Sequence, residues 1–141
     1  MIENRSSPSA TVIPVLSYED VGEASAWLCD VFGFRERLRI GSHRAQLVFG
    51  EGAVIVRERG AGQSNDAANA THSVHVRVAD ANSHYEHARQ QGARILQPPT
   101  DFPFGERQYT AEDLGGHQWT FSQSIADVDP ASWGGTAIDL G

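Results

Sequence analysis

The hydrophobic and polar positions of the chain follow one pattern that occurs twice. Residues 11–18 (TVIPVLSY) are apolar and β-branched, which is typical of a strand. Asp20, with Glu23 three residues later, has the form of a capping box and predicts a helix from Val21. Apolar residues then recur at helical spacing until Gly33, where the helix is expected to end. Three short strands should follow, over residues 35–40, 45–50 and 53–58.

The pattern returns after residues 59–70, a segment rich in Gly, Ala, Ser and Asn that lacks apolar periodicity and predicts a linker. Residues 72–78 (HSVHVRV) form the next expected strand, Asp80 the next helix cap and Gly92 the next helix stop. Strands are then expected over residues 93–97, 106–111 and 117–123.

The repeat predicts two βαβββ modules, because the two aspartate caps and the two glycine stops each recur at a period near sixty residues. The expected boundaries are a flexible N-terminus (1–10), the first module (11–58), the linker, the second module (71–123) and a C-terminal tail (124–141). A helix covers one face of each sheet and leaves the other face bare. We therefore expect an α+β fold in which the modules pair into a curved, half-open mixed sheet with a ligand cleft. Pairing with a second copy would complete the cleft, so a homodimer is expected.

Composition narrows the function. The net charge of -7 argues against nucleic acid and anionic membranes as partners, because both bind clustered positive charge. All eleven basic residues are arginine, so no lysine can form a Schiff base. The single cysteine, Cys29, cannot form an internal disulfide, and the N-terminus does not resemble a signal peptide. These features predict a cytoplasmic protein, with Cys29 as a small buried hydrophobe.

Two further stretches carry a resemblance to a known family. These are AWLCDVFGF (26–34), at the end of the first helix, and FGERQYTAEDLGGHQWTF (104–121). Together with the paired modules they resemble the vicinal oxygen chelate superfamily, over residues 12–121. That superfamily includes glyoxalase I, bleomycin-resistance proteins, fosfomycin-resistance enzymes and extradiol dioxygenases. The chain is most similar to the small bleomycin-resistance-like members.

The resemblance also implies where a metal would bind. Metal-dependent members take His or Glu ligands from the first strand of each module and from a last strand. Here the corresponding positions are Ile13, Ser73 and Thr120, none of which is a usual ligand. We therefore expect no metal and no other cofactor. A shifted register would instead draw on four other side chains, which are His43, Glu58, His72 and His75.

Strand alternation selects the residues expected to line the cleft. His75 should point into it and His72 should lie on the valine face under the helix, so the two cannot chelate one ion. Arg77 is expected to meet a carboxylate of the protein. The predicted ligand-binding residues on strands are Ile13, Val15, Ser17, Ser73, His75, Arg77, Gln118, Thr120 and Ser122.

Two aromatic residues complete the predicted binding set. Phe102 and Phe104 lie in PPTDFPFGER, which reads as a proline-stiffened loop without a strand of its own at the mouth of the cleft. They could form a buried plug or stack on a planar ligand. The neighbouring Asp113 and His117 stand four apart like an acid and a base, but Asp-Leu-Gly-Gly is typical of a turn, and a turn role is expected for Asp113.

The sequence thus favours a metal-free protein that binds a planar or cationic organic molecule, similar to the proteins that sequester an antibiotic. No catalytic residue is expected. Three alternatives stay open. The first is a divalent-metal lyase, isomerase or dioxygenase. The second is a cofactorless enzyme of secondary metabolism with His75 as general base. The third is an interaction module without a ligand.

Overall fold

The computed structural model describes residues 2–60 and 71–141, so residues 61–70 of the expected linker lie outside the described part. The first half of the chain forms β1 (Val15–Tyr18), α1 (Val21–Trp27), a π-helical turn (Leu28–Phe32), β2 (Arg35–Ile40), β3 (Arg44–Phe49) and β4 (Gly52–Glu58). The second half forms β5 (Val74–Arg77), α2 (Ala81–Gln90), β6 (Arg94–Phe102), β7 (Glu106–Glu112), β8 (Gln118–Ser124) and a 3-10 turn (Pro130–Trp133). No helix within the described residues is long and apolar enough to span a membrane.

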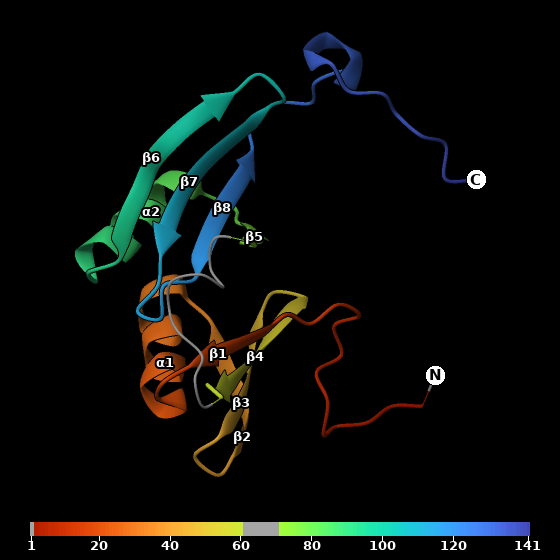
Figure 1. Cartoon of the computed structure of the whole chain (residues 1–141). Helices are drawn as coiled ribbons and strands as arrows, with labels where there is room; N and C mark the ends of the chain where they lie inside the picture. Colours follow the sequence, from red (N-terminus) through yellow and green to blue (C-terminus); the bar gives the residue numbers. More distant parts are fainter. Residues whose placement is uncertain (1, 61–70) are drawn as a thin grey trace.

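The two βαβββ modules are confirmed, and the fold is α+β (Figure 1). Each module forms its own four-stranded sheet, in the order β1-β4-β3-β2 and β5-β8-β7-β6. The first strand of each module runs parallel to the last, and the other pairs are antiparallel. β1 and β5 are therefore both edge strands within the chain.

The helix boundaries lie where the sequence placed them. The Asp20 carboxylate accepts a hydrogen bond from the backbone N–H of Glu23 at 2.9 Å, and Asp80 caps α2 in the same way through Ser83 at 3.0 Å. These caps satisfy N–H groups that have no partner inside the helix. Gly33, which follows the π-helical turn of the first module, and Gly92, which follows α2, have φ angles of 87° and 93°. Only glycine adopts this backbone conformation without strain.

Both sheets pack one face against the helices around a shared core. Phe32, at the end of the π-helical turn, has its ring centroid 5.4 Å from that of Trp119 and 4.8 Å from that of Phe121 on β8. All three side chains are buried, as are Leu16 and Tyr18 on β1. Truncating a buried aromatic residue of this size typically costs about 3–5 kcal/mol. The first module thus packs against the sheet of the second module through a shared cluster of aromatic side chains.

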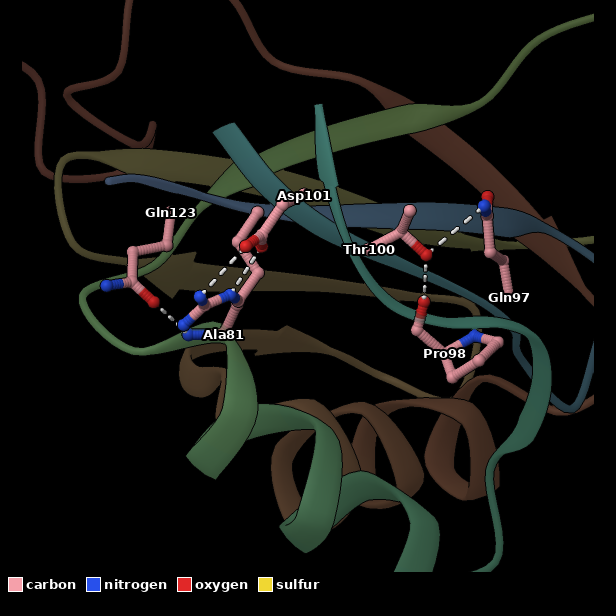
Figure 2. Close-up of polar contacts among 7 residues, drawn as sticks. Ala81, Gln97, Pro98, Thr100, Asp101 and Gln123 are labelled. Carbon is pink, nitrogen blue, oxygen red and sulfur yellow. Dashed lines mark hydrogen bonds and ion pairs between the residues drawn. The ribbon is translucent and has the colours of Figure 1, made fainter. Parts of the chain in front are cut away.

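The expectation that PPTDFPFGER has no strand of its own is wrong. β6 continues through Pro98 and Pro99 to Phe102, with register shifts against β7 between Ile95 and Thr100. Proline is tolerated because β6 is an edge strand, where an outward-facing N–H needs no partner. Figure 2 shows the irregular segment, in which the Thr100 hydroxyl donates to the Pro98 carbonyl oxygen at 2.9 Å.

The first strand is shorter than the sequence suggests. The apolar run from residue 11 predicts a strand to Tyr18, but β1 begins only at Val15. Pro14, which precedes it, cannot donate a backbone hydrogen bond, although its carbonyl oxygen accepts one from Ile55 N–H at 2.9 Å. Ile13 therefore lies outside the strand. Similarly, β5 begins at Val74, so His72 and Ser73 lie before it.

Candidate functional site

The face of the second sheet that points away from the core is polar. Val74 and Val76 of β5 are in register with Trp119 and Phe121 of β8, on the core side. His75 and Arg77 are in register with Thr120 and Ser122, and these four side chains share the opposite face. Gln118 alternates along β8 onto the same face as Thr120 and Ser122. The structure thus brings together five of the residues that the sequence predicted for the cleft.

β7 adds residues to this face that the sequence reasoning missed, among them Thr110 and Gln108. Thr110 lies in register with Thr120, and their hydroxyl oxygens are 3.2 Å apart. Gln108 lies in register with Ser122 and donates to its hydroxyl oxygen at 3.3 Å. The signal was present in the alternation of ERQYTA, where Tyr109 is buried in the core and its neighbours must face the other way. The face combines neutral amides and hydroxyls with the charged Arg77 of β5 and Glu106 and Glu112 of β7.

The outer face of the first sheet carries the other predicted strand residues. Val15 and Ser17 of β1 are in register with Ile55 and Arg57 of β4, and they alternate with the buried Leu16 and Tyr18. The Arg57 Nε–H donates to the Ser17 hydroxyl oxygen at 2.8 Å. Ile13 does not join this face. It lines a separate crevice of about 770 Å³ beneath the N-terminal segment.

A second crevice of about 520 Å³ lies between the modules. Its walls come from the segment before β1, from the β3–β4 turn and from β5. Apolar side chains dominate, and His75 and Arg77 are the polar residues that also belong to the polar face of the second sheet. The lining residues include Val12, Pro14, Phe34, Phe49, Val54, Val74 and Val76. An apolar crevice beside a hydrogen-bonding surface is the usual composition of a small-molecule site.

Phe102 and Phe104 form an aromatic cluster with Trp133 of the C-terminal tail. The Phe102 and Phe104 rings stack with centroids 5.3 Å apart, and the Phe104 and Trp133 centroids are 5.4 Å apart. Phe102 is in register with Glu106, at the end of the polar face of the second sheet. The Trp133 side chain is 45% exposed, so this aromatic cluster is only partly buried.

The residues at the metal positions do not fit a divalent ion. Ile13 is apolar, Ser73 is an exposed residue before β5, and the Thr120 hydroxyl is bonded to Thr110. In residues 2–60 and 71–141, no group of three His, Cys, Asp or Glu side chains lies close enough to hold a metal ion. The imidazole of His72, expected under the helix, instead lies with its centroid 5.9 Å from that of His117.

Asp113 has the turn role expected for it. Its buried carboxylate accepts hydrogen bonds from the backbone N–H groups of Gly115 and His117, both at 2.9 Å, from Trp119 Nε1 at 2.9 Å and from the Tyr18 hydroxyl at 2.5 Å. Burial, followed by the charge of Asp113, raises the pKa of Tyr18 well above its usual value. With four hydrogen-bond donors, the Asp113 carboxylate has a structural role: it joins β1 to the turn between β7 and β8.

Two histidines join the modules as well. His117 Nε2 lies 2.9 Å from the Ser17 carbonyl oxygen, and His84 Nε2 on α2 lies 2.8 Å from the Phe32 carbonyl oxygen. Because a carbonyl only accepts, His84 donates from Nε2 and its Nδ1 accepts from the Tyr109 hydroxyl. Burial lowers the pKa of His84, so the folded protein favours the neutral imidazole.

Arg77 does not meet a carboxylate as expected. Among residues 2–60 and 71–141, four arginines make ion pairs, which are Arg39 with Glu36, Arg89 with Glu86, Arg94 with Glu112 and Arg107 with Asp101. Arg77 makes none with any residue that the structure describes. The reason is its position: its row on the polar face continues to Ser122 and Gln108, which are both neutral.

The paired modules and the shared core define a small α+β protein. The Glyoxalase/Bleomycin resistance protein/Dioxygenase superfamily model matches residues 12–121, and the chain belongs to that family. Among solved structures, TioX from Micromonospora sp. ML1 is 36% identical, with 85% of this chain and 100% of that chain covered and a TM-score of 0.67.

More distant structures share the fold alone. UcmS2 is 20% identical over 78% of this chain and 94% of its own, with a TM-score of 0.66. The genomically encoded fosfomycin resistance protein FosX from Listeria monocytogenes is 14% identical over 82% of this chain and 93% of its own, with a TM-score of 0.65. No curated protein matches the chain.

Proposed function

We propose that the protein binds a small organic molecule without a metal, in the manner of an antibiotic-sequestering member of its family. The observation that carries this proposal is the apolar crevice of about 520 Å³ beside the polar face of β5 and β8. The crevice suits a planar, apolar body, and the exposed His75 and Arg77 side chains, which line it, supply polar groups. The description of the matching family includes bleomycin resistance proteins, which supports antibiotics as the ligand class to test.

A homodimer is part of the proposal. β1 and β5 each have a hydrogen-bonded neighbour on one side only, which leaves an open strand edge in each module. A second copy would cover these edges and enclose the crevice, by a two-fold contact of the kind most homo-oligomers use. We also place the protein in the cytoplasm, which the free thiol of Cys29 supports.

Native mass spectrometry tests the proposal on protein purified without chelator and without a metal-affinity step. We expect a dimer mass without bound metal, together with a co-purified organic adduct. Stoichiometric zinc, iron, nickel or manganese that is lost on His75→Ala would overturn the metal-free reading and favour the enzyme. A metal-free turnover whose pH profile follows a single histidine would instead identify His75 as a general base.

A pair of variants locates the adduct. Val76→Phe adds an aromatic ring to the wall of the crevice and should reduce the adduct fraction. Ile138→Phe adds a ring in the tail, where the side chain is 75% exposed, and should leave the fraction unchanged. An adduct that survives Val76→Phe would show that the ligand binds elsewhere.

A further inference from the structure

The outer face of the first sheet carries three guanidinium groups. Arg57 lies between Ser17 on β1 and Arg44 on β3, in register with both. Arg37, at the irregularity of β2, reaches the same face, because its guanidinium donates to the side-chain oxygen of Gln46. Gln46 lies one row away, in register with Ile55.

None of these three arginines makes an ion pair with any residue in the described part of the chain. The chain has 18 acidic residues against 11 arginines, and four arginines elsewhere do find carboxylate partners. Arg37 donates only to the neutral oxygens of Gln46 and of the Arg5 carbonyl group. Arg57 donates from Nε to Ser17, while the guanidinium of Arg44 makes no hydrogen bond to any described residue.

This arrangement costs stability in the free protein. Arg44 and Arg57 stand directly opposite each other on neighbouring strands, and like charges in that position repel. A carboxylate in the same row would remove the repulsion, but the row contains Ser17 and Ile40 instead. An acidic ligand that accepts hydrogen bonds from both guanidinium groups would replace this repulsion by charge-assisted hydrogen bonds.

The residues in register with Arg44 and Arg57, and those in the neighbouring row, define the contacts that such a ligand would make. The bond from Arg57 Nε to Ser17 fixes one edge of the guanidinium and leaves its Nη groups for another acceptor. Val15 and Ile55 occupy the adjacent row, and Val15 is 46% exposed. An acidic group would therefore lie against Arg44 and Arg57, with an apolar body beside Val15 and Ile55.

We propose that Arg44 and Arg57 bind the acidic group of an organic acid, such as an aromatic carboxylate, on the outer face of the β1-β4-β3-β2 sheet. This inference goes beyond the proposed function, because neither arginine lines the crevice between the modules. It replaces the cationic compound that the acidic net charge suggested. Net charge describes the whole surface, whereas the ligand meets the local row of arginines.

Isothermal titration of the full-length protein with 2-naphthoate and with the neutral 2-naphthamide tests the proposal. The two probes share a ring system and differ in charge. We expect naphthoate to bind roughly tenfold to a hundredfold more tightly, as for hydrogen bonds to a charged group, and to weaken as salt is added. Arg44→Gln and Arg57→Gln should each bring the affinity ratio close to one. Arg57→Lys should retain part of it.

Arg89→Gln is the matched control, because it removes the same charge from an exposed position on α2. It should leave the affinity ratio unchanged. A separate urea titration of the free proteins distinguishes a ligand site from a structural one. Arg44→Gln and Arg57→Gln should unfold at the same or a higher midpoint than the parent protein, because each relieves the repulsion.

Equal affinity for naphthoate and naphthamide would overturn the anion site and leave small-molecule binding standing. A ratio that survives both glutamine variants, or a marked loss of stability in them, would also overturn it. Failure of naphthoate to bind at millimolar concentration would overturn it as well. The adduct found by native mass spectrometry decides the proposed function independently of these results.

Discussion

Replacing Tyr18 by phenylalanine removes one hydrogen-bond donor and almost no volume. The Tyr18 hydroxyl donates to the Asp113 carboxylate at 2.5 Å, and both side chains are buried. The two residues are 95 positions apart and belong to different modules. The substitution therefore probes a polar link between the modules without creating a cavity, which would add a second cost.

The expected loss follows from the state of the acceptor. Asp113 would keep three donors, from Gly115, His117 and Trp119, but one lone pair of a buried carboxylate would be left unsatisfied. A hydrogen bond to a charged group contributes about 1.5–3 kcal/mol. We expect Tyr18→Phe to lower the free energy of unfolding by that amount. At about 1–3 kcal/mol per molar urea, the unfolding midpoint should fall by roughly 0.5–3 M.

Urea titration at neutral pH measures this change, with Tyr85→Phe as the control. Tyr85 is half-buried on α2, stacks edge-on against Tyr109 with centroids 5.5 Å apart, and makes no hydrogen bond through its hydroxyl to a residue that the structure describes. Its substitution should cost less than about 0.5 kcal/mol. A Tyr18→Phe protein as stable as the parent, or a Tyr85→Phe protein that loses as much, would refute the assignment of the link to Asp113.

Three other outcomes are expected. Burial lowers the pKa of His84 in the folded state. The contribution of His84 to the free energy of unfolding should therefore be complete above its unfolded-state pKa of about 6.5, and it should be lost as the pH falls through the lowered folded-state pKa. Urea unfolding midpoints measured across this pH range, for the parent protein and for His84→Gln, check this. Gly115→Ala should cost about 1–3 kcal/mol, since the added Cβ would lie 2.6 Å from the Tyr18 ring, and a drop in Tm measures it. Burial, followed by Glu36, raises the pKa of Cys29, so iodoacetamide should alkylate it more slowly at neutral pH than it alkylates the urea-unfolded chain.

Much of the candidate site could be placed from strand alternation. The assignment of Trp119 and Phe121 to the core and of His75, Thr120 and Ser122 to the opposite face needed only the two-residue period of a strand. The alternation was less informative where a strand begins or bulges. Ile13 was assigned to the cleft wall because an apolar run does not show where pairing starts.

Interactions between distant residues were beyond such reasoning. Arg77 has several acidic residues within its own module, and only the register shows that its row holds neutral groups. The opposition of Arg44 and Arg57 likewise depends on the turn between β3 and β4 and on the pairing it sets. Neither residue was singled out from the sequence, because charged residues that alternate in a strand usually face solvent.

The sequence by itself determined the local elements of this protein. Asp20 and Asp80 begin the helices and Gly33 and Gly92 follow the helical segments, because capping and positive φ are properties of single residues and their immediate neighbours. Only the tertiary structure decided which side chains became partners. Hydrogen bonds such as the one between Tyr18 and Asp113 join residues whose separation along the chain carries no signal, and packing of the two modules around one core brings them together.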